Sequence, residues 1–324
     1  MTGNLVRIDH SDPSRADILF VDWLLGNQCN YACSYCPASL HDGSRPWQPL
    51  EVVSAFAEHL IAISRQRGKK VCFQLIGGEV TLIRGLSSLL SRISELGGQV
   101  GLISNGSRDL AWWKEVREHL DFAILTFHPE QGRAEHIRRV AQYLSETIRT
   151  HVNVAAPLFH FDESVRVAEM LERDCQDVSI TLKPMLIDFG TELYPYTEAQ
   201  MRTFRERQFK PVQTRALGSV RGEMIARWDD GSASQMPATA FLTRGMNRWA
   251  GWHCHAGMEL LSIDESGNIF KGLCRQDGQI GHISSPDTFE LPSAAALCTR
   301  PTCVCQTDIM VSRYNKSRVD ATAS

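Results

Sequence analysis

The segment "NQCNYACSYCP" (residues 27–37) follows the apolar run "ILFVDWLL" (18–25) and places Cys29, Cys33 and Cys36 within eight positions. The apolar run has the length and composition of a buried β-strand. Three thiols at this spacing suit a soft metal ion or an iron–sulfur cluster. A four-iron cluster held by three cysteines keeps one iron open to a small molecule. A zinc loop that takes its fourth ligand from elsewhere is the alternative.

The composition excludes several classes of protein. The 324 residues are 43% hydrophobic and 22% charged, with a formal net charge of -3. This length suits one large domain with a small appendage, and the low net charge argues against a nucleic-acid or membrane partner. The sequence shows no apolar run of about 18 residues and no secretory signal, so we expect a cytoplasmic protein. In that reducing compartment, ten cysteines indicate metal or catalytic thiols rather than disulfides.

Short apolar runs alternate with amphipathic stretches from about residue 17 to residue 185. The predicted strands are 18–25, 71–76, 99–104, 122–127, 151–156 and 178–183, and the predicted helices are 52–63, 86–96, 110–120, 137–148, 164–172 and one near 197–209. Regular alternation of strands and helices predicts a parallel sheet with helices outside it. Six units favour an α/β fold of the partial (β/α)6, TIM-like barrel type, although a doubly wound sheet fits the alternation equally well.

The rest of the chain predicts a linker and a small C-terminal β-hairpin and helix extension. "MELLSIDESGNIFKGL" (258–273) has two apolar runs around "DESGN", which is typical of a hairpin. Five further cysteines lie in or beside this region, namely Cys254, Cys274, Cys298, Cys303 and Cys305. The expected division is an N-terminal segment (1–16), a barrel (17–215), a linker (216–250), a cysteine-rich extension (251–310) and a polar tail (311–324).

Two more motifs follow the next predicted strands. "LIGGEVTL" (75–82) contains Gly77-Gly78-Glu79 at the end of the second strand, and "SNG" (104–106) ends the third. Enzymes built from βα units place their chemistry at the carboxyl ends of the strands. The glycine–glutamate motif and the three cysteines are therefore expected at the same mouth of the barrel.

The order of these motifs resembles that of the radical S-adenosylmethionine (radical SAM) superfamily over roughly residues 17–185. The C-x3-C-x2-C pattern resembles its cluster loop, Tyr35 occupies the aromatic position before the last cysteine, and Gly77-Gly78-Glu79 resembles its GGE motif. The resemblance implies that S-adenosylmethionine chelates the open iron and that a flavodoxin- or ferredoxin-type protein supplies an electron. The sulfonium bond then breaks, and a 5′-deoxyadenosyl radical takes hydrogen from a substrate carbon.

The resemblance also implies which residues touch the cofactor. Carbonyls of Gly77 and Gly78 would accept hydrogen bonds from its ammonium group, and Glu79 would support that end. The remaining candidates for the cofactor site are Tyr35, Ser104, Asn105, His128 and Asn153. Turn capping by Ser104 and Asn105, and structural roles for His128 and Asn153, are the alternatives.

The second set of cysteines resembles the "twitch" extension of radical SAM enzymes, a shortened SPASM domain that holds one auxiliary four-iron cluster. The resemblance implies that Cys254 and Cys274 are two of its ligands and that two of Cys298, Cys303 and Cys305 complete the site. The cysteine left over is a candidate hydrogen-atom donor, as in radical SAM epimerases, or else a buried spare thiol. Zinc is the alternative metal.

Three functions compete at this stage. The first is an oxidoreductase or epimerase that dehydrogenates or epimerises a small polar metabolite of the aminosugar or alcohol type. The second is epimerisation or cross-linking of a ribosomally made peptide; the few residues before the first predicted strand leave no room for a leader-binding domain, which favours the first. The third is a non-catalytic iron–sulfur or zinc protein, which does not explain a GGE motif one βα unit after the cysteines.

Overall fold

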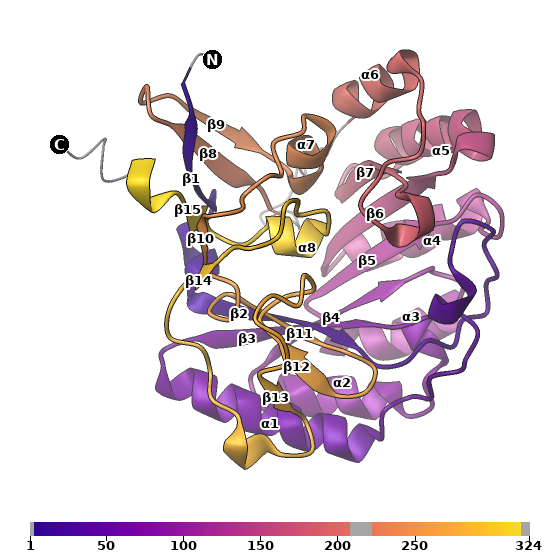
Figure 1. Ribbon diagram of the computed structural model, residues 1–324. Helices are drawn as coiled ribbons and strands as arrows, with labels where there is room; N and C mark the ends of the chain where they lie inside the picture. The colour runs from indigo at the N-terminus through magenta and orange to yellow at the C-terminus, as the bar shows by residue number, and fades with distance from the viewer. Residues whose placement is uncertain (1–2, 208–221, 319–324) are drawn as a thin grey trace.

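The computed structural model describes residues 3–207 and 222–318 and shows two β-sheets (Figure 1). The larger sheet has nine strands in the order β13-β12-β11-β2-β3-β4-β5-β6-β7. Six consecutive strands of this sheet are parallel and are β2 (Ile18–Leu24), β3 (Lys70–Ile76), β4 (Gln99–Ser104), β5 (Phe122–Phe127), β6 (Arg149–Ala156) and β7 (Val178–Pro184). They confirm the six predicted strands.

A helix follows each of these six strands. They are α1 (Leu50–Gln66), α2 (Leu86–Glu95), α3 (Leu110–Val116), α4 (Ala134–Ser145), α5 (Phe161–Asp174) and α6 (Glu198–Glu206). The strands from β2 to β7 lie side by side in chain order, whereas a doubly wound sheet reverses its order at a switch point. The fold is therefore the predicted partial, TIM-like barrel, with β13 and β7 as the edges of an open sheet. Part of the predicted sixth helix, at 208–209, lies outside the described residues.

The outer face of the sheet packs against the helices. Trp23 on β2 and Phe73 on β3 are fully buried with Phe56 and Leu60 of α1 in one large apolar cluster. These side chains alternate with others that point to the inner face, as the period of two in a strand requires. Cys175, at the end of α5, is buried in the same cluster.

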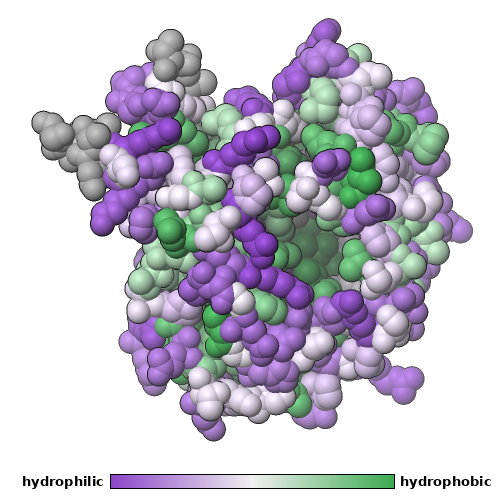
Figure 2. All heavy atoms as spheres, in the orientation of Figure 1, coloured by the Kyte–Doolittle hydropathy of each residue, from purple (hydrophilic) through white to green (hydrophobic). Residues whose placement is uncertain are grey.

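The inner face is partly apolar and partly polar. Toward the amino ends of the strands it is apolar, with Phe20, Cys72, Phe122 and Ile124 packed together. The inner face also carries buried polar side chains, which are Asp22, Gln74, His151, Asn153, Ser179 and Thr181. Figure 2 shows that the molecule is hollowed on this side, with hydrophobic residues at the floor of the hollow.

The predicted hairpin is confirmed, and it extends the barrel sheet. The strands β11 (Leu260–Ile263) and β12 (Asn268–Phe270) are antiparallel, with Ser262 opposite Phe270. β11 pairs in parallel with β2, and β13 (Gly281–His282) adds to β12. The hairpin therefore lies directly beside the strand that leads into the cysteine loop.

The second sheet corrects three interpretations of the sequence. Its order is β14 (Ala296–Leu297), β10 (His253–Cys254), β15 (Arg313–Tyr314), β1 (Leu5–His10), β8 (Met224–Trp228) and β9 (Ala233–Met236). The segment 1–16 thus contains a strand, the described part of the predicted linker, 222–250, contains the strands β8 and β9 in addition to a helix of the kind expected there, α7 (Ala238–Thr243), and the predicted tail contains β15. These strands are short, and apart from the local pair β8 and β9 they join segments far apart along the chain, so the local pattern did not reveal them.

No helix within residues 3–207 and 222–318 combines the length and the apolar character needed to cross a membrane.

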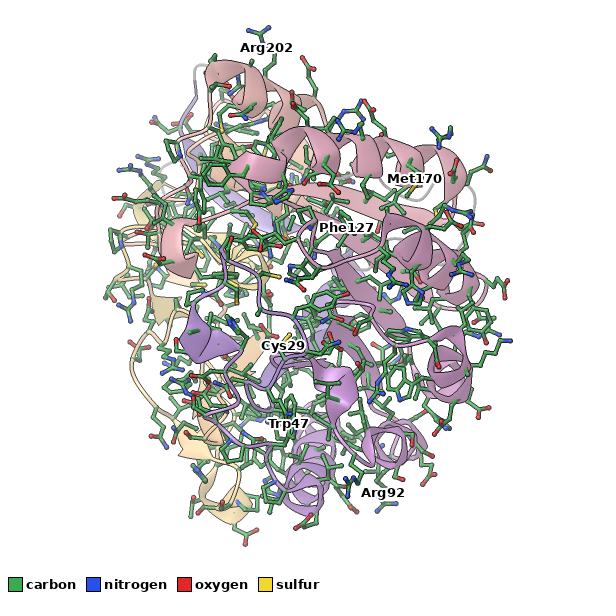
Figure 3. All side chains as sticks on the ribbon, turned by 90° about the vertical axis from the view of Figure 1, so that its right-hand side faces the viewer. Cys29, Trp47, Arg92, Phe127, Met170 and Arg202 are labelled. Carbon is green, nitrogen blue, oxygen red and sulfur yellow. The ribbon has the colours of Figure 1, made fainter. Side chains whose placement is uncertain are left out.

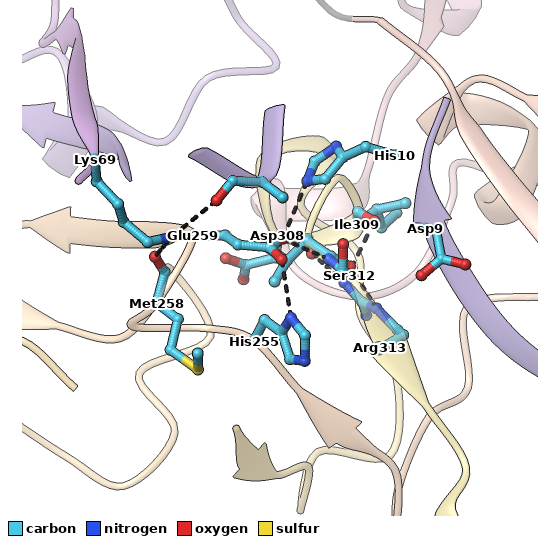
Figure 4. Close-up of polar contacts among 12 residues, drawn as sticks. Asp9, His10, Lys69, His255, Met258, Glu259, Asp308, Ile309, Ser312 and Arg313 are labelled. Atoms are coloured by element: carbon cyan, nitrogen blue, oxygen red, sulfur yellow. Dashed lines mark hydrogen bonds and ion pairs between the residues drawn. The ribbon is translucent and has the colours of Figure 1, made fainter. Parts of the chain in front are cut away.

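A buried carboxylate joins the two sheets (Figure 4). Glu259, just before β11, accepts hydrogen bonds from Nε2 of His10 at 3.0 Å, Nδ1 of His255 at 2.9 Å and the backbone N–H of Ser312 at 2.9 Å. Burial by itself raises the pKa of Glu259, but these hydrogen bonds outweigh it and hold the pKa well below its usual range. Glu259 therefore connects β1 and the segments beside β10 and β15 to the barrel sheet.

Replacing Glu259 should destabilise the protein. In Glu259→Gln the amide nitrogen cannot accept a hydrogen bond, so buried donors lose their partner and the free energy of unfolding should fall by about 1–3 kcal/mol. The control is Glu58→Gln, which removes an exposed ion pair with Arg92 and should cost less than about 1 kcal/mol. Denaturant unfolding of both variants measures this, and equal losses would contradict the role given to Glu259.

Candidate active site

The three cysteines of the first motif lie on the loop that leaves β2. Cys33 is buried, and Cys29 and Cys36 are half-buried. Cys33 and Tyr35 pack with Ala155 and Met185, at the ends of β6 and β7. The loop therefore reaches across the mouth of the barrel. Figure 3 shows Cys29 in the middle of the molecule, whereas Arg92 and Arg202 point outward from the helices.

The chemistry of this donor set fits an iron–sulfur cluster. Burial raises the pKa of Cys29, and it raises the pKa of Cys33 and of Cys36 to about 11. The thiols also act on one another, because negative charge on Cys29 raises the pKa of the other two. A bound metal supplies the positive charge that lets such thiols lose their protons. Among the residues that the structure describes, no three His, Cys, Asp or Glu side chains converge on a position for one metal ion.

The two glycines of the GGE motif bring the second loop against the first. The backbone N–H of Gly78 donates to the carbonyl of Gly26 at 3.1 Å, and that of Glu79 donates to the carbonyl of Gln28 at 2.8 Å. A Cβ atom on Gly78 would lie 2.3 Å from the Gln28 oxygen, which leaves no room for a side chain. The structure thus gives Gly78 a packing role, and carbonyl contacts from Gly77 and Gly78 to the cofactor stay a prediction.

Glu79 is fully buried and satisfied by the protein itself. Its Oε1 accepts hydrogen bonds from the N–H of Thr81 at 3.1 Å, the hydroxyl of Thr81 at 2.6 Å and the hydroxyl of Ser104 at 2.8 Å. Its Oε2 accepts from the N–H of Asn105 at 2.6 Å. Burial raises the pKa of Glu79, and these hydrogen bonds oppose the rise. The carboxylate therefore ties the end of β3 to the end of β4.

Asn105 carries this network on to the cysteine loop. Its Nδ2 donates to Oδ1 of Asn30 at 2.9 Å and lies 3.9 Å from the sulfur of Cys29. Its Oδ1 also caps the turn by accepting from the N–H of Ser107 at 3.0 Å. The structure brings Cys29, Glu79, Ser104 and Asn105 together, and turn capping accompanies this role. Contacts from Ser104 and Asn105 to a cofactor stay a prediction.

His128, after β5, supports the aromatic side chains of the loop. Its Nδ1 lies 2.9 Å from the hydroxyl of Tyr35, and its ring meets that of Tyr31 edge-on. Burial, together with the charge of Lys183, lowers the pKa of His128 to about 4, and burial raises the pKa of Tyr35. Near neutral pH an uncharged histidine therefore shares a hydrogen bond with a neutral tyrosine hydroxyl. This contact fits the structural alternative for His128, and contact with substrate or cofactor stays a prediction.

Glu130 holds the centre of the cysteine loop, a role that the sequence did not suggest. Its Oε2 accepts from the N–H of Ser34 at 2.7 Å, and its Oε1 accepts from the hydroxyl of Ser34 at 2.5 Å. Ser34 stands between Cys33 and Cys36. An acidic residue just beyond a strand end was the available signal, but its partner depends on how the loop folds.

Asn153 lies deeper in the barrel than the loop. It is buried on β6, and its Oδ1 accepts from Nε2 of His151 at 3.2 Å, while Nδ1 of that ring lies 2.8 Å from the hydroxyl of Ser179. Ala155, two residues further along the same face, is the one that packs with Cys33 and Tyr35. Asn153 thus belongs to the polar inner wall, and its contact with the cofactor stays a prediction.

The five remaining cysteines gather where the second sheet meets the hairpin. The backbone N–H of Cys298 donates to Trp252 beside Cys254, and negative charge on Cys254 and Cys298 raises the pKa of Cys274. Cys303 and Cys305 immediately precede α8 (Gln306–Ile309). Cys303 packs against the apolar cluster of the second sheet, whereas negative charge on Asp22, on the inner face of β2, raises the pKa of Cys305. Which four thiols would bind an auxiliary cluster stays a prediction.

The comparison with protein families settles the class of this domain. The sequence pattern described as the radical SAM superfamily matches residues 23–173, which span the cysteine loop, the GGE motif and the strands β3 to β6. The chain carries a radical SAM domain. Membership implies an enzyme with a four-iron cluster and S-adenosylmethionine as cofactors. No protein of curated function matches the chain.

Two solved structures share the radical SAM fold with this chain. Native anSMEcpe with bound AdoMet has a TM-score of 0.50 at 14% identity, over 85% of this chain and 80% of that one. SuiB from Streptococcus suis has a TM-score of 0.50 at 13% identity, over 82% of this chain. The alignment spans only 63% of the SuiB chain. At these identities the likeness establishes the fold alone.

The role of Glu130 leads to a prediction about cluster retention. Glu130→Ala removes two charge-assisted hydrogen bonds from the loop, each typically worth about 1.5–3 kcal/mol. We expect the reconstituted variant to lose iron to a chelator about tenfold faster or more, since about 1.4 kcal/mol corresponds to a factor of ten. Ser34→Ala is the matched control, because it keeps the backbone hydrogen bond and should lose iron more slowly than Glu130→Ala. Equal rates in Glu130→Ala and the unaltered protein would contradict this role.

Proposed function

We propose that this protein cleaves S-adenosylmethionine reductively at a four-iron cluster held by Cys29, Cys33 and Cys36, and removes hydrogen from a substrate C–H bond. The observation that carries the proposal is the hydrogen-bond chain from Glu79 through Asn105 to the vicinity of Cys29 at the barrel mouth. When bound, the cluster and S-adenosylmethionine supply a 5′-deoxyadenosyl radical as the hydrogen-abstracting agent.

The protein's own residues bind and orient these groups. The loops after β2, β3 and β4 converge at Glu79. Its carboxylate binds the backbone of Asn105 after β4, and its backbone N–H binds Gln28 at the start of the cysteine loop. In the proposal, Gly77 and Gly78 face the ammonium group of the cofactor, and Ser104, Asn105 and Tyr35 line the same site. Glu79 acts mainly by holding this backbone in place, since the protein itself already supplies four donors to its carboxylate.

The proposed substrate is a small polar metabolite of the aminosugar or alcohol type, which is dehydrogenated or epimerised. The support is the buried polar wall of the barrel, where Gln74 donates to Asp22 at 3.0 Å and Asn153 accepts from His151. Buried polar side chains are costly unless they are satisfied. A wall of this kind provides several donors and acceptors for hydroxyl or amino groups of a substrate.

A ribosomally made peptide is the second candidate, and exposed apolar side chains support it. Leu40, Phe159, Ile187 and Phe189 are exposed; Leu40 lies in the long segment between β2 and α1, and the other three lie just after β6 or β7, at the mouth of the barrel. Phe159 is 97% exposed. An apolar rim of this kind suits a longer substrate that also contacts the surface around the mouth. In this alternative the reaction is epimerisation or cross-linking.

We further propose one auxiliary four-iron cluster, with Cys254 and Cys274 as ligands and two of Cys298, Cys303 and Cys305 as the others. Its support is that the charge of the buried Asp308 acts on Cys254, Cys274, Cys303 and Cys305, while Cys298 acts on Cys254 and Cys274. A flavodoxin- or ferredoxin-type protein is the proposed electron donor, and a cytoplasmic location stays a prediction from the sequence.

Iron content and cofactor cleavage test the proposal. The anaerobically reconstituted protein should hold about eight irons in two four-iron clusters. The triple variant Cys29→Ala, Cys33→Ala, Cys36→Ala should hold half as much and make no 5′-deoxyadenosine with dithionite. Continued cleavage in the triple variant would refute the assignment of the loop. An unaltered protein that binds iron but never cleaves S-adenosylmethionine would favour a non-catalytic iron–sulfur protein.

Incorporation of deuterium from heavy water distinguishes epimerisation from dehydrogenation or cross-linking. If a cysteine returns a hydrogen atom, as epimerisation requires, the product formed in heavy water should gain one deuterium. Among Cys298→Ala, Cys303→Ala and Cys305→Ala, two should lose auxiliary iron, while the third should keep its iron, make 5′-deoxyadenosine and fail to turn over. A product without deuterium, and loss of iron in all three variants, would indicate dehydrogenation or cross-linking instead.

A further inference from the structure

A buried arginine stands among the thiols of the second cysteine group. Arg313 on β15 is 3% exposed, and it lies directly opposite Cys254 of the antiparallel strand β10 and Ile8 of β1. Residues directly opposite one another in an antiparallel pair point to the same face, with Cβ atoms about 4.5–5.5 Å apart. The side chains of Arg313 and Cys254 are therefore neighbours on one face of the sheet.

Backbone and aromatic contacts hold the guanidinium group in place. Its Nε donates to the carbonyl of Val311 at 3.0 Å, and Nη2 donates to the carbonyls of Asp308 and Ile309. The guanidinium carbon lies 3.9 Å from the centre of the Trp249 ring. These hydrogen bonds fix the charge of Arg313 in position, its side chain also hydrogen-bonds with Cys303, and the buried carboxylate of Asp308 interacts with its charge.

The charge of Arg313 lowers the pKa of two nearby thiols. Burial raises the pKa of Cys254 and of Cys303, and Arg313 is the strongest influence in the opposite direction on both. Asp308 is the other buried charge, and its carboxylate accepts hydrogen bonds from the N–H groups of Leu273, at 2.9 Å, and Cys274, at 2.8 Å. Arg313 and Asp308 therefore flank the thiols, with the arginine nearer Cys254 and Cys303.

A buried arginine keeps its proton, and burying an unpaired charge costs several kcal/mol. Four thiolates around a four-iron cluster carry net negative charge, which increases when the cluster takes up an electron. A fixed positive charge beside it stabilises the reduced state more than the oxidised state.

We propose that Arg313 is the buried counter-charge of the auxiliary cluster and raises its reduction potential. The inference rests on the auxiliary cluster proposed above and adds the residue that tunes it. A higher potential suits dehydrogenation, in which a substrate radical gives one electron to this cluster and one proton to water, leaving a double bond. The flavodoxin- or ferredoxin-type partner then takes that electron on.

The test measures the potential of the auxiliary cluster alone. In the background Cys29→Ala, Cys33→Ala, Cys36→Ala, a redox titration followed by electron paramagnetic resonance compares Arg313→Gln, Arg313→Lys and the parent. Arg313→Gln should shift the potential to more negative values, and Arg313→Lys should keep most of the parent value because it keeps the charge. Both should lower the thermal midpoint, since both lose carbonyl hydrogen bonds.

Arg108→Gln is the matched control, because Arg108 also donates to a carbonyl, that of Thr81, and lies over the ring of Trp112. It sits on the side of the first cluster and should leave the auxiliary potential unchanged. If Arg313→Gln cannot hold iron but Arg313→Lys can, the positive charge is needed for cluster binding, which supports the inference.

Three results would overturn it, and they are distinguishable. Absence of iron from the parent background would refute the auxiliary cluster itself, and the inference with it. If Arg313→Gln and Arg313→Lys both hold iron and have the same reduction potential, the auxiliary cluster is supported and the role of Arg313 is refuted. Loss of iron from both variants would show that Arg313 serves the fold rather than the charge.

Discussion

The backbone of Gln28 lies against Gly78 with no space for a side chain between them, and the arrangement of the site depends on this contact. It places the start of the cysteine loop on the GGE segment through the hydrogen bonds to Gly26 and Gln28. Glu79 then accepts a hydrogen bond from the backbone of Asn105 at the end of β4, and the side chain of Asn105 donates one to Asn30 beside Cys29. A larger residue at position 78 would separate the two loops, and the hydrogen bonds that join Glu79, Asn105 and Asn30 would be displaced as well.

Strand β2 lies between the two groups of thiols and contacts the segments that carry both. Its carboxyl end leads into Cys29, Cys33 and Cys36, while Asp22, on its inner face, acts electrostatically on Cys305. On its other side β2 pairs with β11 of the hairpin. The barrel and the cysteine-rich region therefore share one continuous sheet, in which a shift of β2 would alter both groups of thiols at once.

The sequence was enough to predict those parts of the molecule that leave a pattern in neighbouring residues. The six strands and their helices follow from apolar periodicity, the cysteine loop from the spacing of its thiols, and the GGE motif from its resemblance to the radical SAM superfamily. The second sheet was missed because β1 pairs with β8 and β15, whose distance along the chain leaves no pattern in either segment. The roles of Glu130 and Arg313 were missed for a related reason. A charged residue shows its partner only after folding, and Arg313 stands in a stretch whose polar composition predicted a tail.

The distant pairings of the second sheet also set an order of biogenesis. A ribosome adds about 5–20 residues per second, so β2 to β7 emerge well before β10, β14 and β15. The loop of Cys29 is therefore synthesised well before Cys298, Cys303 and Cys305. Until then β1, which lies between β15 and β8 in the finished sheet, exposes an unpaired edge. The strands of the barrel are therefore all synthesised before β15, one of the two neighbours of β1.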